Sequence, residues 1–347
     1  MMPGRLKFAS ILAILPCACV AAVAIYGGAN TGPPTHDDDP DLASVTSGEA
    51  DWPVVGGARD EQHYSSLSLI NQNNVAQLRP AWFAEFDTTR GQEAEPVVVD
   101  GTMYVTTAWS KVYAFDATTG RQLWRYDPEV PGDSAARGCC DVVNRGAAVY
   151  KGKVYVGTFD GRLIALDART GILAWSVDTI DRIGREKSYS ITGAPRVVRN
   201  KVIIGNGGAE FGARGYVTAY DTATGRLVWR FYTVPGEPGV RDGAASDDVL
   251  AGIAEKTWSG TWWKGGGGGT AWDAIVYDRE LNRLYLGVGN GAPHSHLKRS
   301  AGKGDNLFLA SIVAVDPDTG KYIYGIIRSI PVNPGIIRRP SQSCLPP

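Results

Sequence analysis

One motif recurs along the chain and restricts its fold more than any other feature. Each copy has an alanine, an aspartate two residues later, a glycine four residues further on, and an aromatic residue four residues after the glycine. The copies are YAFDATTGRQLW (113–124), IALDARTGILAW (164–175), TAYDTATGRLVW (218–229) and VAVDPDTGKYIY (313–324). Their aspartates are 51, 54 and 95 residues apart, so we expect the last interval to contain a degenerate copy at 274–290.

Each copy is typical of a strand, a tight turn and a second strand. Alternating apolar residues precede the aspartate, as in YVTTAWSKVYAF (104–115) and VYVGTFDGRLIAL (154–166), and predict half-buried strands. In Asp-x-x-x-Gly the carboxylate caps backbone amides and the glycine takes a positive φ. Units of about 50 residues with one packed aromatic each predict a β-propeller. The alternative is a β-sandwich with chance similarity between segments.

Composition supports an all-β fold and excludes some functions. Forty-three glycines and ten tryptophans indicate many turns beside large packed aromatic rings. The formal net charge is −1, so no basic field favours nucleic acid or an anionic membrane surface. We therefore expect no nucleic-acid partner.

The chain begins with features of an export signal. Arg5 and Lys7 precede the apolar run 8–25, and small residues follow it. We predict a signal peptide at 1–28, with an uncleaved membrane anchor as the alternative. The polar segment 29–50 is rich in Pro, Gly and Asp and predicts a disordered leader. This leaves 51–324 as the propeller and 325–347 as a tail.

Two of the five cysteines are adjacent, in RGCCDVVNRG (137–146). Cys17, Cys19 and Cys344 fall in the signal and the tail, so Cys139 and Cys140 form the pair in the body. Neighbouring Cα atoms lie ~3.8 Å apart, whereas an ordinary disulfide spans ~4.4–6.8 Å. The pair therefore either forms a strained ring or stays reduced, and stability is not its purpose.

The repeat and the cysteine pair together resemble the quinoprotein alcohol dehydrogenases of the methanol and ethanol type. These are eight-bladed propellers that carry pyrroloquinoline quinone (PQQ) and a metal, usually calcium. Further strings that match in order are GQEAEPVVVDG, ITGAPRVV, GNGGAEFGARG, GGGGTAWD and GVGNG. The resemblance covers Trp52 to Tyr324, about the first half of a family member. It implies an all-β fold, a propeller of the eight-bladed quinoprotein type with about half of its blades.

The resemblance also implies a role for individual residues. Cys139 and Cys140 match a vicinal disulfide against one face of the quinone, and Trp272 matches the tryptophan on the other face. Arg145 matches an arginine that reaches a cofactor carboxylate, which suits a guanidinium fork. The remaining cofactor contacts implied are Glu93, Thr192, Gly208, Ala209 and Thr270.

Two residues match protein ligands of the metal. They are Glu210 and Asn290, with cofactor oxygens completing an oxygen set of the kind that calcium prefers. A lanthanide in place of calcium stays open. Taken singly, Glu210 is typical of a surface residue and Asn290 of a turn, so only the ordered set of strings indicates a site. The run Gly265–Gly269 lacks a following Lys-Ser/Thr, so we predict a flexible β-turn rather than a phosphate-binding loop.

The function implied is periplasmic oxidation of primary alcohols to aldehydes, with a periplasmic cytochrome c as electron acceptor. The family's general base is an aspartate in a Trp-Asp-Tyr string that follows the fourth copy, and 325–347 contains neither Trp nor Asp. We therefore expect the catalytic aspartate to be absent, with a reading-frame shift near Tyr324 as one cause. The alternative functions are a non-catalytic propeller scaffold and a membrane-bound quinoprotein sugar dehydrogenase. Alcohol specificity and oligomeric state stay open.

Overall fold

A computed structural model describes residues 51–57, 61, 63–180 and 187–327. All of these belong to one compact unit, His36–Pro347. The signal peptide, the leader and most of the tail predicted from the sequence lie outside the described residues. Within them, no helix is both long and apolar enough to cross a membrane.

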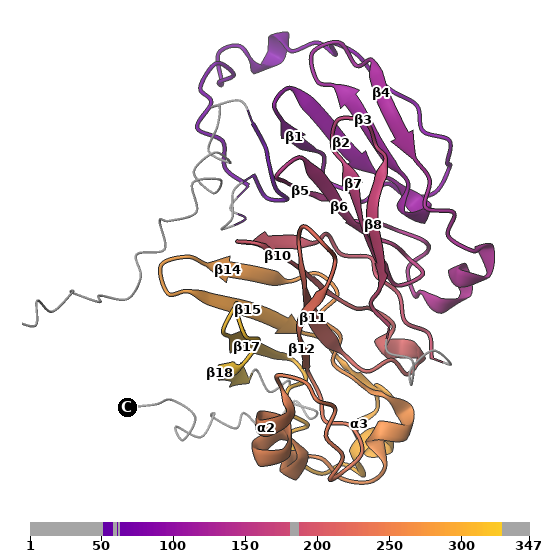
Figure 1. Ribbon diagram of the computed structural model, residues 1–347, viewed down its shortest axis with the longest axis vertical. Helices are drawn as coiled ribbons and strands as arrows, with labels where there is room; N and C mark the ends of the chain where they lie inside the picture. Colours follow the sequence, from indigo (N-terminus) through magenta and orange to yellow (C-terminus); the bar gives the residue numbers. More distant parts are fainter. Residues whose placement is uncertain (1–50, 58–60, 62, 181–186, 328–347) are drawn as a thin grey trace, which may run out of the picture. The chain divides into compact units, whose positions relative to one another are not determined.

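Sixteen of the described strands form four sheets, and each sheet is an antiparallel meander in chain order (Figure 1). The first sheet contains β1 (Val97–Val99), β2 (Thr102–Thr106), β3 (Val112–Asp116) and β4 (Gln122–Tyr126). The second contains β5 (Ala148–Tyr150), β6 (Lys153–Gly157), β7 (Arg162–Asp167) and β8 (Leu173–Asp178). The third contains β9 (Arg196–Val198), β10 (Lys201–Gly205), β11 (Tyr216–Asp221) and β12 (Leu227–Tyr232). The fourth contains β14 (Ile275–Asp278), β15 (Arg283–Val288), β17 (Ser311–Val315) and β18 (Tyr322–Ile327).

The remaining elements lie in connections. A two-stranded pair joins β13 (Gly267–Gly268) to β16 (Gly291–Ala292). The α-helical segments are α2 (Asp247–Val249) and α3 (His296–Ser300). One π-helical turn covers Leu250–Ala254. The 3-10 turns are Val75–Gln77, Ala108–Ser110, Gly132–Arg137, Ala209–Phe211, Glu255–Thr257 and Trp262–Gly265.

Consecutive sheets meet along their first strands. Strand β1 contacts β5, β5 contacts β9, and β9 contacts β14. A row of four-stranded meanders joined at their innermost strands is the arrangement of propeller blades. The prediction of an all-β propeller is therefore confirmed.

The recurring aspartate and glycine form the turn between the third and fourth strands of each blade. In the first blade the Asp116 carboxylate accepts hydrogen bonds from the amides of Thr118 (3.1 Å) and Thr119 (2.8 Å). Gly120 closes this turn at φ +71°, a conformation that costs glycine little. Asp167, Asp221 and Asp316 accept equivalent bonds in the other three blades.

The recurring tryptophan docks each blade on the next one. The indole nitrogens of Trp124, Trp175 and Trp229 donate to backbone carbonyls in the turn of the following blade, at 2.9, 3.2 and 3.0 Å. Each ring lies against the glycine of that turn, where an added Cβ would come within 2.6 to 2.9 Å of it. Close ring-to-backbone contact thus explains why the glycine and the aromatic residue recur together.

A further docking tryptophan carries no repeat motif, so the sequence pattern missed it. Trp82 donates to the Ala117 carbonyl (3.0 Å) and covers Gly120 of the first blade. Its segment forms no helix or strand and alternates between half-buried residues and exposed ones such as Phe83, which is 84% exposed. Only the tertiary contact shows that this tryptophan plays the same role as the other three.

The prediction of a degenerate copy at 274–290 is wrong. These residues form β14 and β15, the first two strands of the blade that also contains the fourth copy. The interval is long because insertions separate β12 from β14 and β15 from β17. Strand β18 also continues to Ile327, three residues beyond Tyr324, where we placed the end of the propeller.

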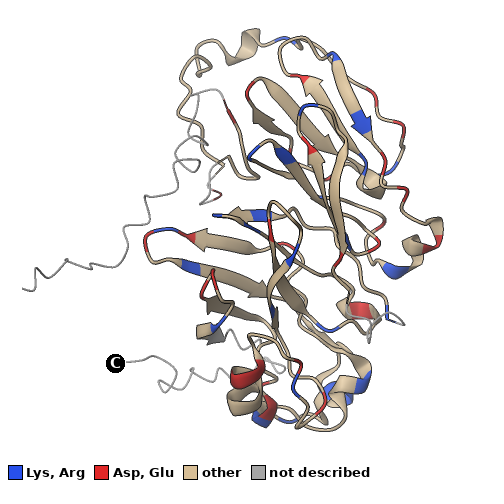
Figure 2. Ribbon diagram, in the orientation of Figure 1, with Lys and Arg blue, Asp and Glu red and all other residues tan. Residues whose placement is uncertain are grey.

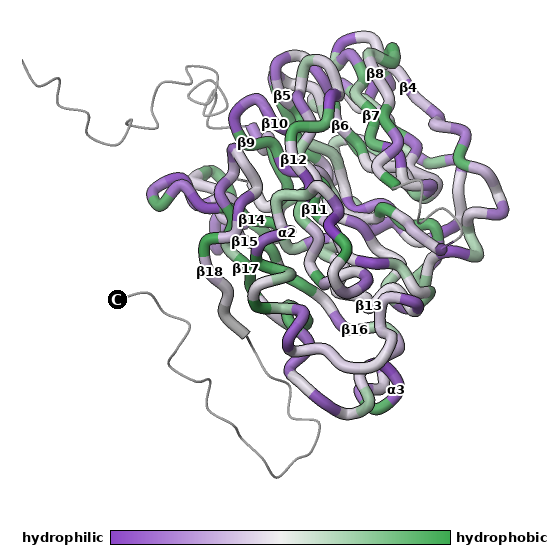
Figure 3. Tube along the Cα trace, turned by 60° about the horizontal axis from the view of Figure 1, so that its bottom comes forward, coloured by the Kyte–Doolittle hydropathy of each residue, from purple (hydrophilic) through white to green (hydrophobic). Residues whose placement is uncertain are grey.

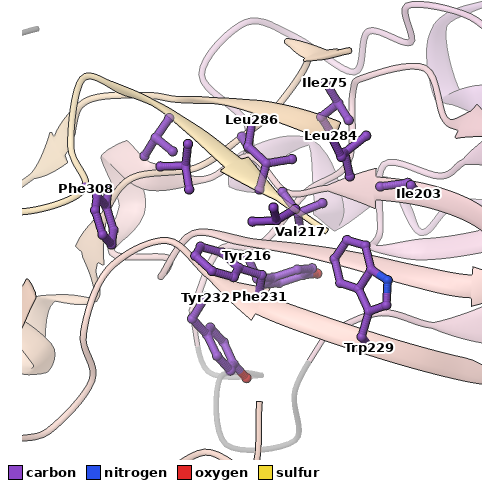
Figure 4. Close-up of a cluster of buried hydrophobic side chains, with 14 of the residues drawn as sticks. Ile203, Tyr216, Val217, Trp229, Phe231, Tyr232, Ile275, Leu284, Leu286 and Phe308 are labelled. Carbon is purple, nitrogen blue, oxygen red and sulfur yellow. The ribbon is translucent and has the colours of Figure 1, made fainter. Parts of the chain in front are cut away.

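Apolar side chains from facing sheets form the core. The largest buried cluster joins the third and fourth blades through residues such as Ile203, Val217, Leu284 and Leu286 (Figure 4). Along the chain the hydrophobic stretches follow the strands and the hydrophilic stretches follow the turns (Figure 3). The packed strands therefore position the loops at the ends of the blades.

Candidate cofactor site

The loops that enter a blade's first strand and those that join its second strand to its third lie at the same end of every blade. In an antiparallel meander, the loop that enters the first strand and the loop that joins the second to the third strand lie at one end. The Asp-x-x-x-Gly turns lie at the other end, together with the turns between the first and second strands. All eleven predicted site residues fall in the first two kinds of loop.

Most of the predicted residues come from loops that enter a first strand. Glu93 precedes β1, Cys139, Cys140 and Arg145 precede β5, Thr192 precedes β9, and Thr270 and Trp272 precede β14. Gly208, Ala209 and Glu210 lie between β10 and β11, and Asn290 lies between β15 and β17. Residues up to 197 positions apart in sequence thus reach one end of the fold.

These loops enclose a cavity of about 250 Å³. Nine of the eleven predicted residues line it, namely Cys139, Cys140, Arg145, Thr192, Gly208, Glu210, Thr270, Trp272 and Asn290. Ala209 does not line it and is buried behind the wall (1% exposed). Glu93 does not line it either but pairs with Arg145 at the edge. A larger, open cavity of about 470 Å³ is lined by turns at the opposite end of the first two blades and contains none of the predicted residues.

Sequence reasoning missed six residues that line the same cavity. They are Gly138, Asp141, Val143, Phe159, Ser190 and Gly207. Five of them neighbour predicted residues in the chain, so a wider window around each motif finds them. Phe159 carries no such signal because it belongs to the β6–β7 loop. Its fully buried ring lies so close to Gly138 that a Cβ there would come within 2.3 Å of it.

Arg145 connects three walls of the cavity. Its guanidinium lies 2.9 Å from the Glu93 carboxylate and 4.9 Å from the centre of the Trp272 ring. Its backbone amide donates to the carbonyl of Thr192 (2.9 Å). A half-buried guanidinium at the wall of a cavity suits an anionic ligand.

The two adjacent cysteines are free, exposed thiols in this structure. The predicted disulfide is therefore not present in it and stays a prediction. Partial burial, with a hydrogen bond to the Cys140 thiol, raises the pKa of Cys139 to about 11. A thiol with such a pKa is protonated at neutral pH, so Cys139 is a poor nucleophile in this form.

Two fully buried asparagines hold the loops that carry site residues. The side-chain amide of Asn144 donates to the Gly157 carbonyl (2.8 Å) and accepts from the backbone amide of Gly146 (3.0 Å). Asn144 and Gly146 flank Arg145 in the chain. Asn206 donates to the carbonyls of Gly207 and Arg214 and accepts from the amide of Tyr216 (2.7 Å). Asn206 therefore closes the loop that contains Glu210.

The residues predicted to ligate a metal fit an oxygen-ligand cation. Glu210 is exposed at the cavity and supplies a carboxylate. The amide nitrogen of Asn290 donates to the Gly291 carbonyl (3.4 Å), which leaves the amide oxygen to act as a ligand. Among the described residues no cluster of three or more His, Cys, Asp or Glu side chains could hold a metal.

Glycines allow the loops around the cavity to approach one another. A Cβ on Gly208 would lie 1.9 Å from the Ser188 carbonyl, and one on Gly193 would lie 2.1 Å from the Trp272 carbonyl.

Acidic and basic residues are interspersed over the fold rather than gathered on one face (Figure 2). The donor set, the flat exposed Trp272 and the glycine-lined walls together fit a planar, anionic cofactor beside a hard cation.

Comparison with known proteins agrees with this geometry. The family model described as the β-propeller domain of PQQ-dependent glucose, ethanol and alcohol dehydrogenases matches residues 52–325. The chain is 54% identical over 314 residues to the dehydrogenase subunit of a quinone alcohol dehydrogenase from Gluconobacter oxydans, covering 88% of this chain and 42% of the relative. It is 45% identical over 298 residues to a 1-butanol dehydrogenase (cytochrome c) from Thauera butanivorans, covering 82% and 41%.

A solved structure shows the same fold. A quinohemoprotein alcohol dehydrogenase from Pseudomonas putida superposes with a TM-score of 0.78 at 54% identity, covering 84% of this chain and 42% of that one. The chain thus spans less than half the length of these relatives. The matched segment contains the whole candidate site and the four described blades except the last two residues of β18, so the chain belongs to the family of PQQ-dependent alcohol dehydrogenases.

Proposed function

We propose that this protein binds PQQ and a calcium ion in the cavity and oxidises primary alcohols to aldehydes. It acts in the periplasm in this proposal. It passes its electrons to a cytochrome c, which the name of the 1-butanol dehydrogenase (cytochrome c) relative supports. The observation that carries the proposal is that nine residues from five separate loops, each implied by the family resemblance, line one cavity.

Each wall of the cavity has a binding task. Arg145 pairs with a carboxylate of the cofactor, and Glu93 holds the guanidinium in place (2.9 Å). Trp272 is 45% exposed and offers a flat apolar face on which a ring stacks. The hydroxyls of Thr192 and Thr270 are further donors at the wall.

Glu210 and Asn290 provide the protein's share of the metal shell. A carboxylate and an amide oxygen are ligands of calcium, and a lanthanide would accept the same hard oxygens. When bound, PQQ accepts the two electrons of the alcohol, and the metal polarises the quinone as a Lewis acid.

The proton of the alcohol needs an acceptor, and neither acidic residue of the cavity fits that task. Asp141 forms an ion pair with Arg90, and Glu210 is the proposed metal ligand. Our proposal keeps the prediction from the sequence that the family's catalytic aspartate is absent. Without it, turnover falls by typically about 10²–10⁴-fold.

Reconstitution of the purified chain tests this proposal. After incubation with PQQ and Ca²⁺ and then desalting, we expect the cofactor absorbance to stay with the protein. Ethanol-dependent reduction of a dye acceptor should be weak. The Arg145→Ala variant should lose the absorbance, whereas Arg169→Ala, in the distant cavity, should retain it. Equal retention by the two variants, or none by the unmodified chain, would overturn the assignment of this cavity.

A further inference from the structure

The glycine run beside Trp272 is not the flexible turn that its composition predicts. Gly266 to Gly269 are buried, and their φ angles lie between +73° and +81°. Two of them form β13, which pairs with β16. The strip is therefore an ordered strand-like segment, and that prediction is wrong.

One edge of the strip is bonded to the segment that follows the Glu210 loop. The amide of Gly215 donates to the Gly268 carbonyl (2.8 Å), and the backbones of Arg214 and Gly268 form an isolated parallel β-bridge. The Thr233 hydroxyl donates to the Gly269 carbonyl (2.5 Å). Because Asn206 also ties the loop to Arg214, this edge is continuous with the loop that carries Glu210.

The other edge is bonded to the loop that carries Asn290. The amide of Gly269 donates to the Asn290 carbonyl (2.8 Å), and the amide of Gly289 donates to the Thr270 carbonyl (3.0 Å). Gly267 and Gly268 pair with Ala292 and Gly291. The strip thus lies between the two loops that supply the proposed metal ligands and is hydrogen-bonded to both.

The spacing between these loops leaves no room for a side chain. A Cβ on Gly268 would lie 2.6 Å from the Ala292 nitrogen and 2.7 Å from the Asn290 carbonyl oxygen. A Cβ on Gly266 would lie 1.9 Å from the Gly212 carbonyl oxygen, on the opposite side. Glycine is therefore required both for the positive φ and for the close approach of three backbones.

We propose that Gly266–Gly269 is a rigid spacer that fixes the separation of Glu210 and Asn290 and thereby sets the size of the cation accepted there. This inference rests on the proposed function, because it concerns the same metal site. None of the four glycines lines the cavity, so we expect them to act by positioning. Selectivity between cations that bind oxygen depends on cavity size and rigidity, which is what such a spacer controls.

Matched glycine variants of the full chain test the spacer. Gly268→Ala forces the Asn290 loop outward, whereas Gly260→Ala has nearly the same φ (+78° against +80°) with nothing within 4 Å of the new Cβ. Backbone strain is therefore alike in the two variants. Equilibrium dialysis with PQQ present measures the dissociation constants of Ca²⁺ and of the larger Sr²⁺.

We expect Gly268→Ala to bind Ca²⁺ about 10- to 100-fold more weakly, as for other supporting residues of metal sites. The loss for Sr²⁺ should be smaller, so the ratio of the two constants shifts, whereas a general loss of stability would weaken both ions alike. Gly260→Ala should keep the ratio of the unmodified chain. If Gly268→Ala does not fold, Gly289→Ala is the milder variant, since its Cβ would lie 2.9 Å from the Thr270 carbonyl.

Two results would overturn the inference, and they differ. An unchanged Ca²⁺-to-Sr²⁺ ratio in the folded glycine variants, with tight binding by the unmodified chain, refutes the spacer and leaves the proposed function standing. Failure of the unmodified chain to bind either ion in the presence of PQQ refutes the proposed metal site, and the spacer with it.

Discussion

Two docking tryptophans offer a controlled measurement of what joins the blades. Trp124 and Trp229 are both nearly buried, at 8% and 5% exposed, and both lie against a turn glycine of the next blade. Their hydrogen bonds are also alike, at 2.9 Å to the Ala168 carbonyl and 3.0 Å to the Pro317 carbonyl. Replacing either one by phenylalanine removes the same donor and a similar ring area.

The two carbonyl acceptors differ in one respect. The hydroxyl of Tyr104 also donates to the Ala168 carbonyl (3.2 Å), so Trp124→Phe leaves that oxygen with a partner. Within the part of the chain that the structure describes, Trp229 is the donor that reaches the Pro317 carbonyl. Trp229→Phe therefore leaves a buried oxygen without a partner, which costs about 1–3 kcal/mol.

We expect both variants to lose the packing of the missing ring atoms, about 1–2 kcal/mol each. Trp229→Phe should lose about 1–3 kcal/mol more than Trp124→Phe because of the unsatisfied carbonyl. Urea unfolding followed by far-ultraviolet circular dichroism gives the free energy of unfolding of each variant without relying on tryptophan fluorescence. Equal losses in the two variants, or a larger loss for Trp124→Phe, would refute the claim that Trp229→Phe leaves the Pro317 carbonyl unsatisfied at a cost to stability.

Three further predictions follow from the turns and the thiols. Gly171→Ala should destabilise the fold by about 1–3 kcal/mol more than Gly152→Ala. The two glycines have nearly the same φ (+71° and +70°), but only a Cβ at position 171 would meet a ring, 2.6 Å from an atom of Trp124. Equal urea midpoints of the two variants would contradict this. Alkylation of Cys139 in the reduced protein, followed by mass spectrometry, should speed up by about tenfold per pH unit from neutral pH towards its pKa of about 11. A rate that levels off at about pH 9, as for an ordinary thiol with a pKa of about 8.5, would count against the burial argument. Hydrogen bonds in the turns lower the pKa of Asp116, Asp167 and Asp221. The stability that these carboxylates contribute is therefore present above the unfolded-state pKa of about 3.9 and is lost as the pH falls through the lowered values. Asp221→Asn should flatten the acid side of the curve of stability against pH, and an unchanged curve would contradict this.

The sequence predicted the blade architecture because the repeat encodes a local turn and one long-range contact. Asp116 and Gly120 form their turn within five residues, which a pattern captures directly. Trp124 then docks on the next turn, so its spacing follows from the blade period. Trp82 makes the same contact without the motif, and its role is visible only in three dimensions.

The site residues were predictable from sequence motifs that match the family in order, and not from the chemical character of single residues. Taken singly, Arg145 and Glu210 are ordinary charged residues, and only the topology brings them to one cavity. The glycine run was misjudged because composition reports freedom of the unfolded chain, whereas three paired backbones determine the order of Gly266–Gly269. Phe159 was missed since a buried phenylalanine in a loop carries no sequence signal.

In the proposed function, one cavity holds PQQ and a metal ion together. If they share the site formed by Arg145, Glu210 and Asn290, each must strengthen the binding of the other by the same factor. Calorimetric titration of PQQ into the purified chain, with Ca²⁺ and with a chelator, measures this directly. We predict one PQQ per chain, bound more tightly in Ca²⁺, with the difference abolished in Glu210→Gln. Binding of PQQ with the same affinity in Ca²⁺ and in the chelator would contradict a shared site.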